Sequence, residues 1–399
     1  MTTPAEGQGN STEMVDTWPS APAGLARLGY MLLIAIGGLM AIGGTTYGLL
    51  TVSSDNPAAD SVLAITVAVI GLAMAMQGKR ALNVAQWRRL SLLPGWVWFG
   101  LLVLVWGLGI VLVKWVPHSI QRTLPPLIVV ASGLASLLFL SLTLRGLRSP
   151  VERQPLSGRL LPQHQVFLST ATAAAFSTGL ALATELVAFA GAIVAVLVVS
   201  QLLGDPSILG IIRQAARDPS SVQHLEEWVL GSPVALVALG GLLVVVAPAI
   251  EEALKGLPLL LFAHQGARLT ERVAILVGVA GGVGFAFAEN AGYMSMLFED
   301  WWLGFWLRVA AAVMHGSCSA FIGRGWYRGI TRRRWGGMLL DLLTGWGVHA
   351  AWNGLALLVA WFAYRESTIG VLFCVLAGLL PLTVLFAWMA WWGIWASER

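Results

Sequence analysis

Residues 248–258 read Pro-Ala-Ile-Glu-Glu-Ala-Leu-Lys-Gly-Leu-Pro and place two adjacent carboxylates and an ammonium in an otherwise apolar run. The flanking segments 242–247 and 259–263 carry no charge, so a helix through this region puts Glu251 and Glu252 inside a membrane span. Each ionised group there costs about 2.5–3.5 kcal/mol on insertion scales, and such groups are usually functional. The stretch therefore predicts a functional site inside a membrane helix.

A purely structural interpretation of this stretch is also open. Glu251 and Lys255 are four residues apart, so they share a helix face and form a neutralising pair. That interpretation leaves Glu252 unexplained, because its side chain is turned by about 100° from that of its neighbour.

The composition predicts an all-α, polytopic membrane protein. Of 399 residues, 57% are hydrophobic and 11% are charged, and the mean hydropathy is +0.77. Apolar windows near twenty residues indicate helices rather than barrel strands. The net charge is +4, and the basic residues lie in short loops between spans, where they act as orientation signals. The expected partner is therefore the lipid bilayer and not nucleic acid. Two cysteines, Cys318 and Cys374, indicate no disulfide framework.

About ten membrane spans are expected, after a flexible cytoplasmic tail over 1–27. They fall at 28–50, 61–78, 93–116, 124–144, 180–203, 233–262, 273–297, 303–323, 336–361 and 368–394. Loops on one side hold fifteen Lys and Arg residues and loops on the other side five, which predicts that both termini are cytoplasmic.

The apolar region 166–203 is too long for one perpendicular span. Its first part, 166–179, is rich in Ser, Thr and Ala and is interpreted as a re-entrant or bundle-lining extension. Glu185 lies in this region, at a position where it can face the bundle interior. The loop that follows predicts an interfacial helix over 208–217, either a connector or a gate.

Three later spans also carry titratable or amide side chains near their middle. These are Glu289 in the seventh span, Arg308 and His315 in the eighth, and Asp341, His349 and Asn353 in the ninth. Carboxylates, imidazoles and neutral donors together can activate a water molecule and stabilise an oxyanion. The candidate catalytic residues are Glu251, Glu252, Glu289, His315, His349 and Asn353. The same Glu and His side chains are also ligands for a divalent metal.

Four motifs in this order resemble the PrsW family of intramembrane proteases. They are Pro-x-x-Glu-Glu-x-x-Lys at 248–255, Phe-x-x-x-Glu-Asn at 285–290, His315, and His-x-x-x-Asn at 349–353. The resemblance covers roughly 180–375. It places the chain with the type II CAAX prenyl endopeptidases in the CPBP group, although those enzymes have a His where Glu289 stands and an Arg in place of Lys255.

The resemblance implies a role for each matched residue. Glu251 and Glu252 form the catalytic pair, Glu289 and His315 complete the polar cavity, and His349 and Asn353 donate to the oxyanion. Supporting positions are Lys255, Asn290, Phe285 and Arg308. The ionisable groups inside spans all lie after residue 180, which divides the chain into a four-helix membrane anchor over 28–165 and, by the resemblance, a protease bundle over 166–399.

The expected reaction is hydrolysis of peptide bonds in membrane-anchored proteins by glutamate-activated water, in a bacterial cytoplasmic membrane. Family resemblance suggests regulatory substrates such as anti-sigma factors. Glu251 is the expected base, because it shares a face with Lys255. The chain lacks a His-Glu-x-x-His helix, so a metal-free site is expected. The alternative is a site for a divalent metal such as zinc. Its ligands would be Glu251, Glu252, Glu289, His315 and His349.

Two other functions remain as alternatives. A serine protease using Ser317 or Ser319 with His349 would leave the glutamates without a role, and no Gly-x-Ser-x-Gly elbow is present. A proton-coupled transporter would also use intramembrane carboxylates and histidines. Transporters usually carry such groups in two repeats, whereas here they lie in one half of the chain.

Overall fold

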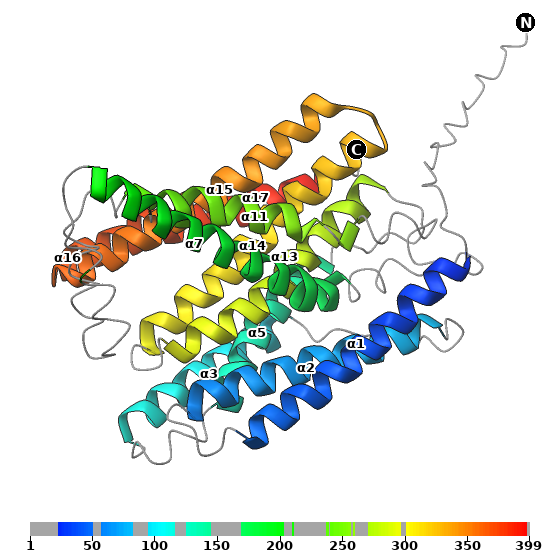
Figure 1. Cartoon of the computed structure of the whole chain (residues 1–399), viewed down its shortest axis with the longest axis horizontal. Coiled ribbons are helices and arrows are strands. Elements are labelled where there is room, and N and C mark those ends of the chain that lie inside the picture. Colours follow the sequence, from blue (N-terminus) through cyan, green and yellow to red (C-terminus); the bar gives the residue numbers. More distant parts are fainter. Residues whose placement is uncertain are drawn as a thin grey trace, which may run out of the picture.

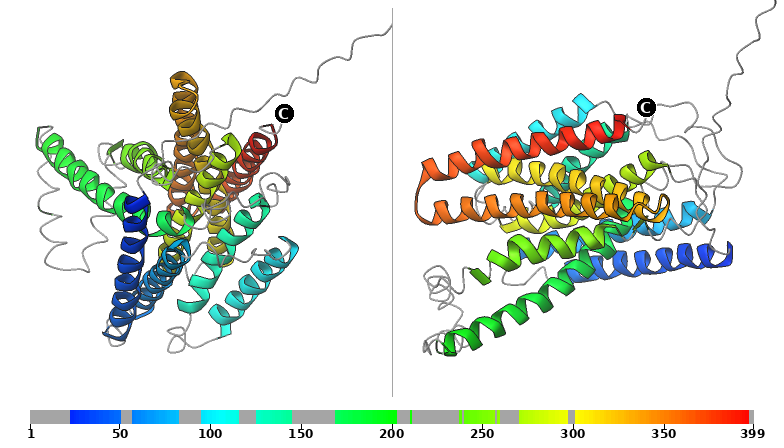
Figure 2. Two further views of the ribbon diagram at one scale, coloured as in Figure 1. Left: turned by 90° about the vertical axis from the view of Figure 1, so that its right-hand side faces the viewer. Right: turned by 90° about the horizontal axis from the view of Figure 1, so that it is seen from above.

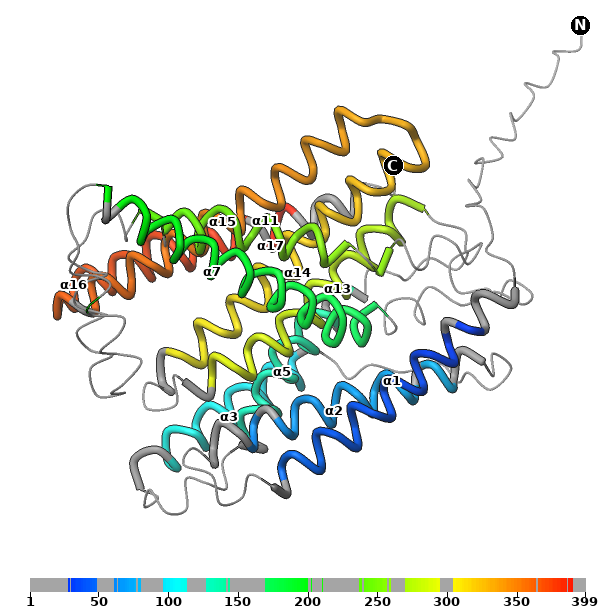
Figure 3. The backbone as a smooth tube through the Cα atoms, viewed as in Figure 1, coloured from blue at the N-terminus to red at the C-terminus, as the bar shows by residue number. Residues whose placement is uncertain are grey.

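The structure is a bundle of helices, seen along its shortest axis in Figure 1. The computed structural model describes residues 23–50, 57–82, 95–115, 125–144, 169–202, 210, 237–238, 240–256, 258–259, 270–296 and 301–396. All regular elements in these ranges are helical, which confirms the all-α prediction. Figure 3 follows the same path as a tube from blue at the first helix to red at the last.

The first four helices are α1 (Ala23–Leu50), α2 (Pro57–Leu82), α3 (Gly95–Trp115) and α5 (Pro125–Leu144). Helix α1 begins at Ala23, five residues before the end of the tail expected over 1–27, which stays a prediction. The rest of that tail lies outside the described residues. Helix α5 packs on the later bundle, where Ser136 Oγ donates to the Val283 carbonyl at 3.1 Å.

The region 166–203 forms one long helix in its described part. The π-helix η3 (Ala173–Ser177) leads directly into α7 (Thr178–Leu202). The beginning of this helix is buried, and Ser169 Oγ donates to the Val277 carbonyl at 2.9 Å. This segment therefore lines the bundle, which is one of the two interpretations given for 166–179. The interfacial helix expected over 208–217 lies outside the described residues, apart from Gly210.

Helices α13 (Glu271–Met296) and α14 (Trp301–Ile330) lie in the middle of the bundle (Figure 2). Their apolar windows are 83% and 72% buried. Glycines let the two backbones touch, because a Cβ atom at Gly278 would overlap the Ser319 carbonyl and one at Gly282 would overlap the His315 carbonyl. Small residues allow this close approach of membrane helices. The contact fixes the register that brings α13 side chains beside His315.

The chain ends with α15 (Trp335–Tyr364), α16 (Thr368–Phe373), the π-helix η6 (Cys374–Leu379) and α17 (Leu380–Ala396). An ion-pair network joins α14 to α15 near the turn between them. Buried Asp341 accepts from Arg324 Nη2 at 2.6 Å and from Arg328 Nη1 at 3.1 Å. Asp341 therefore belongs to a helix-joining network and not to the group around the Glu pair.

Within the described residues, six helices are long and apolar enough to cross a membrane. The apolar parts of α2, α3 and α5 are shorter, at Ala64–Met76, Trp96–Leu112 and Leu127–Leu140. The expected ten spans each contain helix in their described parts, but the count of ten and the cytoplasmic termini stay predictions.

Candidate active site

The Glu pair lies on a short helix whose start is fixed by α15. The π-helix η5 (Leu242–Val246) runs into α11 (Ala247–Lys255), and Pro248, which has no N–H to donate, lies just after the π-helix. A π-helix shifts the backbone ladder, and such turns often occur at functional sites. Two side chains of α15 donate hydrogen bonds to backbone carbonyls of η5. Asn353 Nδ2 donates to Leu243 O at 3.0 Å, and Trp346 Nε1 donates to Val245 O at 2.9 Å. These bonds hold α11 against the face of α15 that carries His349.

Lys255 is the central cation of the site. Its side chain is fully buried, and Nζ donates to Glu251 Oε2 at 3.0 Å and to Glu252 Oε1 at 2.8 Å. It also lies 2.7 Å from His315 Nδ1 and 4.2 Å from the centre of the Phe285 ring. The expectation that Glu252 does not share this partner is wrong, because Lys255 follows it by three residues and lies within reach of both carboxylates.

Two carboxylates orient the two histidines. His349 Nδ1 lies 2.9 Å from Glu252 Oε1, and His315 Nε2 lies 2.6 Å from Glu289 Oε2. A carboxylate at such a distance favours a proton on the nitrogen that faces it, so the other ring nitrogen keeps its lone pair. His349 Nε2 and His315 Nδ1 face Glu251, and His315 Nδ1 also lies beside the Lys255 ammonium.

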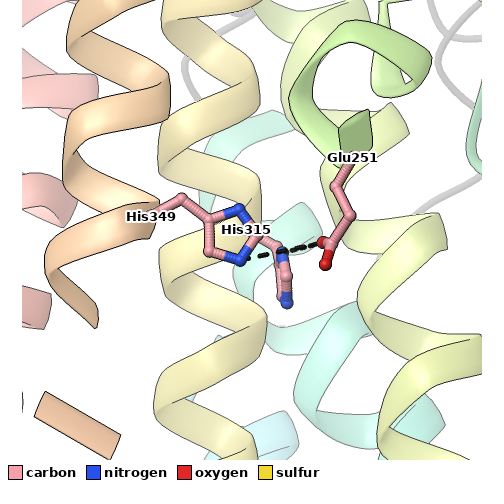
Figure 4. Close-up of side chains that lie close together, drawn as sticks. All are labelled: Glu251, His315 and His349. Carbon is pink, nitrogen blue, oxygen red and sulfur yellow. Dashed lines mark ion pairs between the residues drawn. The ribbon is translucent and has the colours of Figure 1, made fainter. Parts of the chain in front are cut away.

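Glu251, His315 and His349 converge from α11, α14 and α15, as Figure 4 shows. Glu251 Oε2 lies 3.7 Å from His349 Nε2 and 3.9 Å from His315 Nδ1. The imidazole rings meet edge to face, with centroids 4.8 Å apart. One ligand atom from each residue lies within 4.8 Å of the other two, and all three residues are buried.

Arg308 supports the outer side of this cluster. Its Nη2 lies 3.2 Å from Glu289 Oε2, and its Nε donates to Asn290 Oδ1 at 2.6 Å. Asn290 Nδ2 donates in return to the Arg308 carbonyl at 2.9 Å, and the guanidinium lies over the Tyr293 ring. Arg308 and Asn290 thus hold Glu289 in place behind His315.

Most of the expected site residues meet at this point. Glu251, Glu252, Glu289, His315 and His349 come together from four helices, with Lys255 and Phe285 among them. Asn353 instead binds the η5 backbone, so its expected role toward the oxyanion stays a prediction.

The geometry does not support the serine protease alternative. Ser317 Oγ donates to the Val313 carbonyl at 2.7 Å, and Ser319 Oγ donates to Glu252 at 3.4 Å, so neither described hydroxyl bonds to His349.

Glu185 is a further carboxylate near the cluster to which sequence reasoning gave no role. It lies on α7, which packs against α11 and also contacts α13. A single acidic residue in the apolar run 178–202 was the signal that pointed to it.

The donor set fits a divalent metal. Two imidazoles and one carboxylate, with each imidazole also bound to a carboxylate, are ligands typical of zinc hydrolases. Lys255 competes with a metal ion for one ligand atom, His315 Nδ1. The single lone pair of this nitrogen cannot bind the ammonium and a metal ion at the same time. Carboxylate oxygens have several lone pairs, so Glu251 Oε2 can accept from Lys255 and still bind a cation.

These features define a helical membrane protein with a buried carboxylate and histidine centre. A family model described as PrsW family intramembrane metalloprotease matches residues 167–389. This match spans more than half of the chain, which therefore belongs to the PrsW family. No curated protein matches the chain, and no solved structure does. The wider placement in the CPBP group stays a prediction.

Membership of this family supports a multi-pass membrane protein that acts as an intramembrane protease on membrane-associated proteins. The expectation of a metal-free site is not supported, because the family is described as metalloproteases and Glu251, His315 and His349 form a fitting ligand group. The expectation rested on the absence of two histidines on one helix, whereas the fold brings His315 and His349 together from two helices.

Proposed function

We propose that this protein hydrolyses peptide bonds of membrane-anchored proteins with a water molecule activated beside Glu251, His315 and His349. The observation that carries the proposal is the convergence of these three buried residues from three helices. A water molecule at this point contacts a carboxylate and two imidazole nitrogens, which is the environment that peptide hydrolysis needs. The match to a family of intramembrane proteases supports the same reaction.

A divalent metal such as zinc, held by Glu251, His315 and His349, would supply a Lewis acid that lowers the pKa of a bound water and polarises the scissile carbonyl. Glu251 is then a ligand and not the sole base, because its Oε2 faces Nδ1 of His315 and Nε2 of His349. This assignment replaces the metal-free base expected from the sequence.

The other polar residues position these three. Glu252 fixes the His349 ring and Glu289 fixes the His315 ring, each through one nitrogen. Lys255 offsets part of the charge of the Glu pair. Asn353 is a proposed donor to the carbonyl oxygen of the scissile bond, and it would first release the Leu243 carbonyl that it now binds.

The substrates we propose are single-span proteins, including regulatory proteins of the anti-sigma type, in a bacterial cytoplasmic membrane. Helices α1, α2, α3 and α5 form the proposed anchor region over 28–165, and the protease bundle extends over 166–399. The buried position of the cluster supports this substrate class, because a peptide must come from between the helices to reach it.

The test uses purified protein in liposomes with a pool of quenched-fluorescent single-span peptides. Wild type should cleave some of these peptides, EDTA should stop cleavage, and added zinc should restore it. Glu251→Gln should lose at least about two orders of magnitude in rate. Ser317→Ala, on the same helix as His315, should keep the wild-type rate.

Each outcome decides between the functions. An inactive Ser317→Ala beside an active Glu251→Gln would establish the serine alternative. Cleavage that survives complete metal removal but not Glu251→Gln would restore the metal-free base. A wild type that cleaves no peptide but moves protons across the liposome membrane would support the transporter alternative.

A further inference from the structure

The turn between α14 and α15 carries three consecutive exposed arginines, Arg332, Arg333 and Arg334. It joins the candidate membrane spans Gly304–Ile330 and Trp335–Ala363 and lies at one end of the bundle (Figure 1). At 27 residues, the first of these spans is about 40 Å long, which is close to the thickness of a bilayer with its headgroups. The arginine turn therefore lies at the level of the lipid headgroups.

Backbone hydrogen bonds fix the arginine turn. The Thr331 N–H donates to the Tyr327 carbonyl at 2.9 Å, and the Arg334 N–H donates to the Arg328 carbonyl at 2.9 Å. Arg333 reverses the chain between the two helices with φ at 52°, in the left-handed region. The side chains of Arg333 and Arg334 thus leave the turn from defined positions.

The carboxylates Asp341 and Glu271, which lie near this turn, already bind other arginines. Asp341 accepts from Arg324 Nη2 at 2.6 Å and from Arg328 Nη1 at 3.1 Å. Glu271 Oε1 lies 3.2 Å from Arg328 Nη2. The negative charge of both groups is therefore offset on the inner side of the turn.

Two arginines of the turn keep an uncompensated charge. Arg332 Nε donates to the Tyr327 hydroxyl at 3.1 Å, and its guanidinium lies 5.7 Å from the centre of that ring. The side chains of Arg333 and Arg334 have no hydrogen-bond or ion-pair partner within the part of the chain that the structure describes. Two neighbouring guanidinium groups at the headgroup level suit a phosphate, which arginine binds through two parallel hydrogen bonds.

An apolar track runs along α15 from the turn into the membrane. Trp335, Leu339 and Leu343 follow one another at intervals of four residues, so they share one face of the helix. Their exposed fractions are 60%, 57% and 49%. Tryptophan is enriched at the membrane interface, and leucines below it contact acyl chains. This face thus continues the arginine turn in the direction that the chains of a phospholipid take.

We propose that the arginine turn is a binding site for one anionic phospholipid. The guanidinium groups of Arg333 and Arg334 hold its phosphate, and an acyl chain lies along Trp335, Leu339 and Leu343. A zwitterionic lipid fits less well, because its own cationic group offsets the phosphate charge that the two arginines attract.

A lipid at this position fastens the hairpin of α14 and α15. These helices carry His315 and His349, so the lipid stabilises the contact that brings the two histidines together. The inference does not depend on peptide hydrolysis, and its test measures lipid binding alone.

The experiment titrates the purified full-length protein in detergent with phosphatidylglycerol and measures Kd by native mass spectrometry. An arginine near an anionic membrane surface contributes about fivefold in affinity, so Arg333→Gln/Arg334→Gln should bind this lipid about 25-fold more weakly than the wild type. Arg333→Lys/Arg334→Lys keeps both charges and should stay within about fivefold of the wild-type Kd. Phosphatidylcholine should bind the wild type and the glutamine variant equally.

Thermal unfolding gives a second measurement. Phosphatidylglycerol should raise the Tm of the wild type and leave that of Arg333→Gln/Arg334→Gln unchanged. Without added lipid the two proteins should unfold at the same temperature, because exposed substitutions away from packed contacts change stability little. Inorganic phosphate alone should not raise Tm, because it has no chain to contact the apolar track.

Arg365→Gln is the matched control, since Arg365 is an exposed arginine at the opposite end of α15. This variant should keep the wild-type Kd for phosphatidylglycerol. The inference is overturned if the wild type binds both lipids equally, or if Arg333→Gln/Arg334→Gln keeps the wild-type Kd. An equal loss in Arg365→Gln would show general charge attraction, and an equal Tm rise with inorganic phosphate would show a site for free anions. Either result would also overturn the lipid site.

Discussion

Replacing Lys255 with methionine removes the cation at the centre of the site and should destabilise the metal-free protein strongly. The ammonium is fully buried and contacts Glu251 and Glu252 at 3.0 and 2.8 Å. Removing one partner of a buried ion pair costs about 3–5 kcal/mol, because the remaining charge is left without compensation. Here two carboxylates lose their cation, so we expect the upper part of that range in EDTA.

Zinc should then restore much of the lost stability. The variant frees the lone pair of His315 Nδ1, which Lys255 holds at 2.7 Å in the parent. A ligand at 100 times its Kd stabilises the folded state by about 2.7 kcal/mol. The assay is thermal unfolding of both proteins in detergent, first with EDTA and then over a series of zinc concentrations. Zinc should raise Tm more in Lys255→Met than in the parent.

Arg324→Met is the control for this prediction. It removes one of the two arginine partners of buried Asp341, which Arg324 contacts at 2.6 and 3.1 Å, in a network that does not touch the metal ligands. This variant should also lose stability, but zinc should not restore the loss beyond the effect seen in the parent. The reasoning is refuted if Lys255→Met is as stable as the parent in EDTA, or if zinc acts equally on both variants.

Three further predictions address the supporting residues, the helix contact and the topology. Glu252→Gln and Glu289→Gln should each lower zinc affinity about 10–100-fold, because each carboxylate orients one histidine ligand. Competition titrations measure this affinity, and a parental value would exclude the orienting role. Gly282→Ala should cost about 1–3 kcal/mol and reduce cleavage, because the added methyl overlaps the His315 carbonyl, whereas Gly292→Ala on the same helix has free space and should be neutral in thermal unfolding. Reporter fusions at positions 85, 155, 268 and 330 should report the cytoplasm and those at 55, 215 and 365 the outside, and a cytoplasmic report at 215 would contradict the proposed span order.

The sequence predicts the helices and the residues of the cluster well, for a physical reason. Apolar windows predict helices because backbone groups in lipid must be satisfied within the segment. Charged and polar groups in such windows are expensive, so Glu251, Glu289, His315 and His349 stand out before any contact is known. Their convergence follows from the same cost, because separate exposure to lipid would leave each one uncompensated.

The pairing of these residues could not be read from the sequence, because it depends on the register between helices. The contact of Gly282 with the His315 backbone sets one register, and the bond of Asn353 to the η5 carbonyl sets another. The π-helices also interrupt the regular period that sequence patterns assume. For these reasons the sharing of Lys255 by both glutamates appears only in the structure.

The most direct test of the central claim is the mass of the cleavage products formed in water enriched in oxygen-18. A membrane peptide cleaved by the reconstituted protein should carry one oxygen-18 atom in its new carboxyl terminus, because a water molecule attacks the carbonyl. Glu251→Gln protein, reconstituted at equal amount, should give no such product above background. Labelled product at the same rate with Glu251→Gln, or cleavage without label in the wild type, would contradict the account.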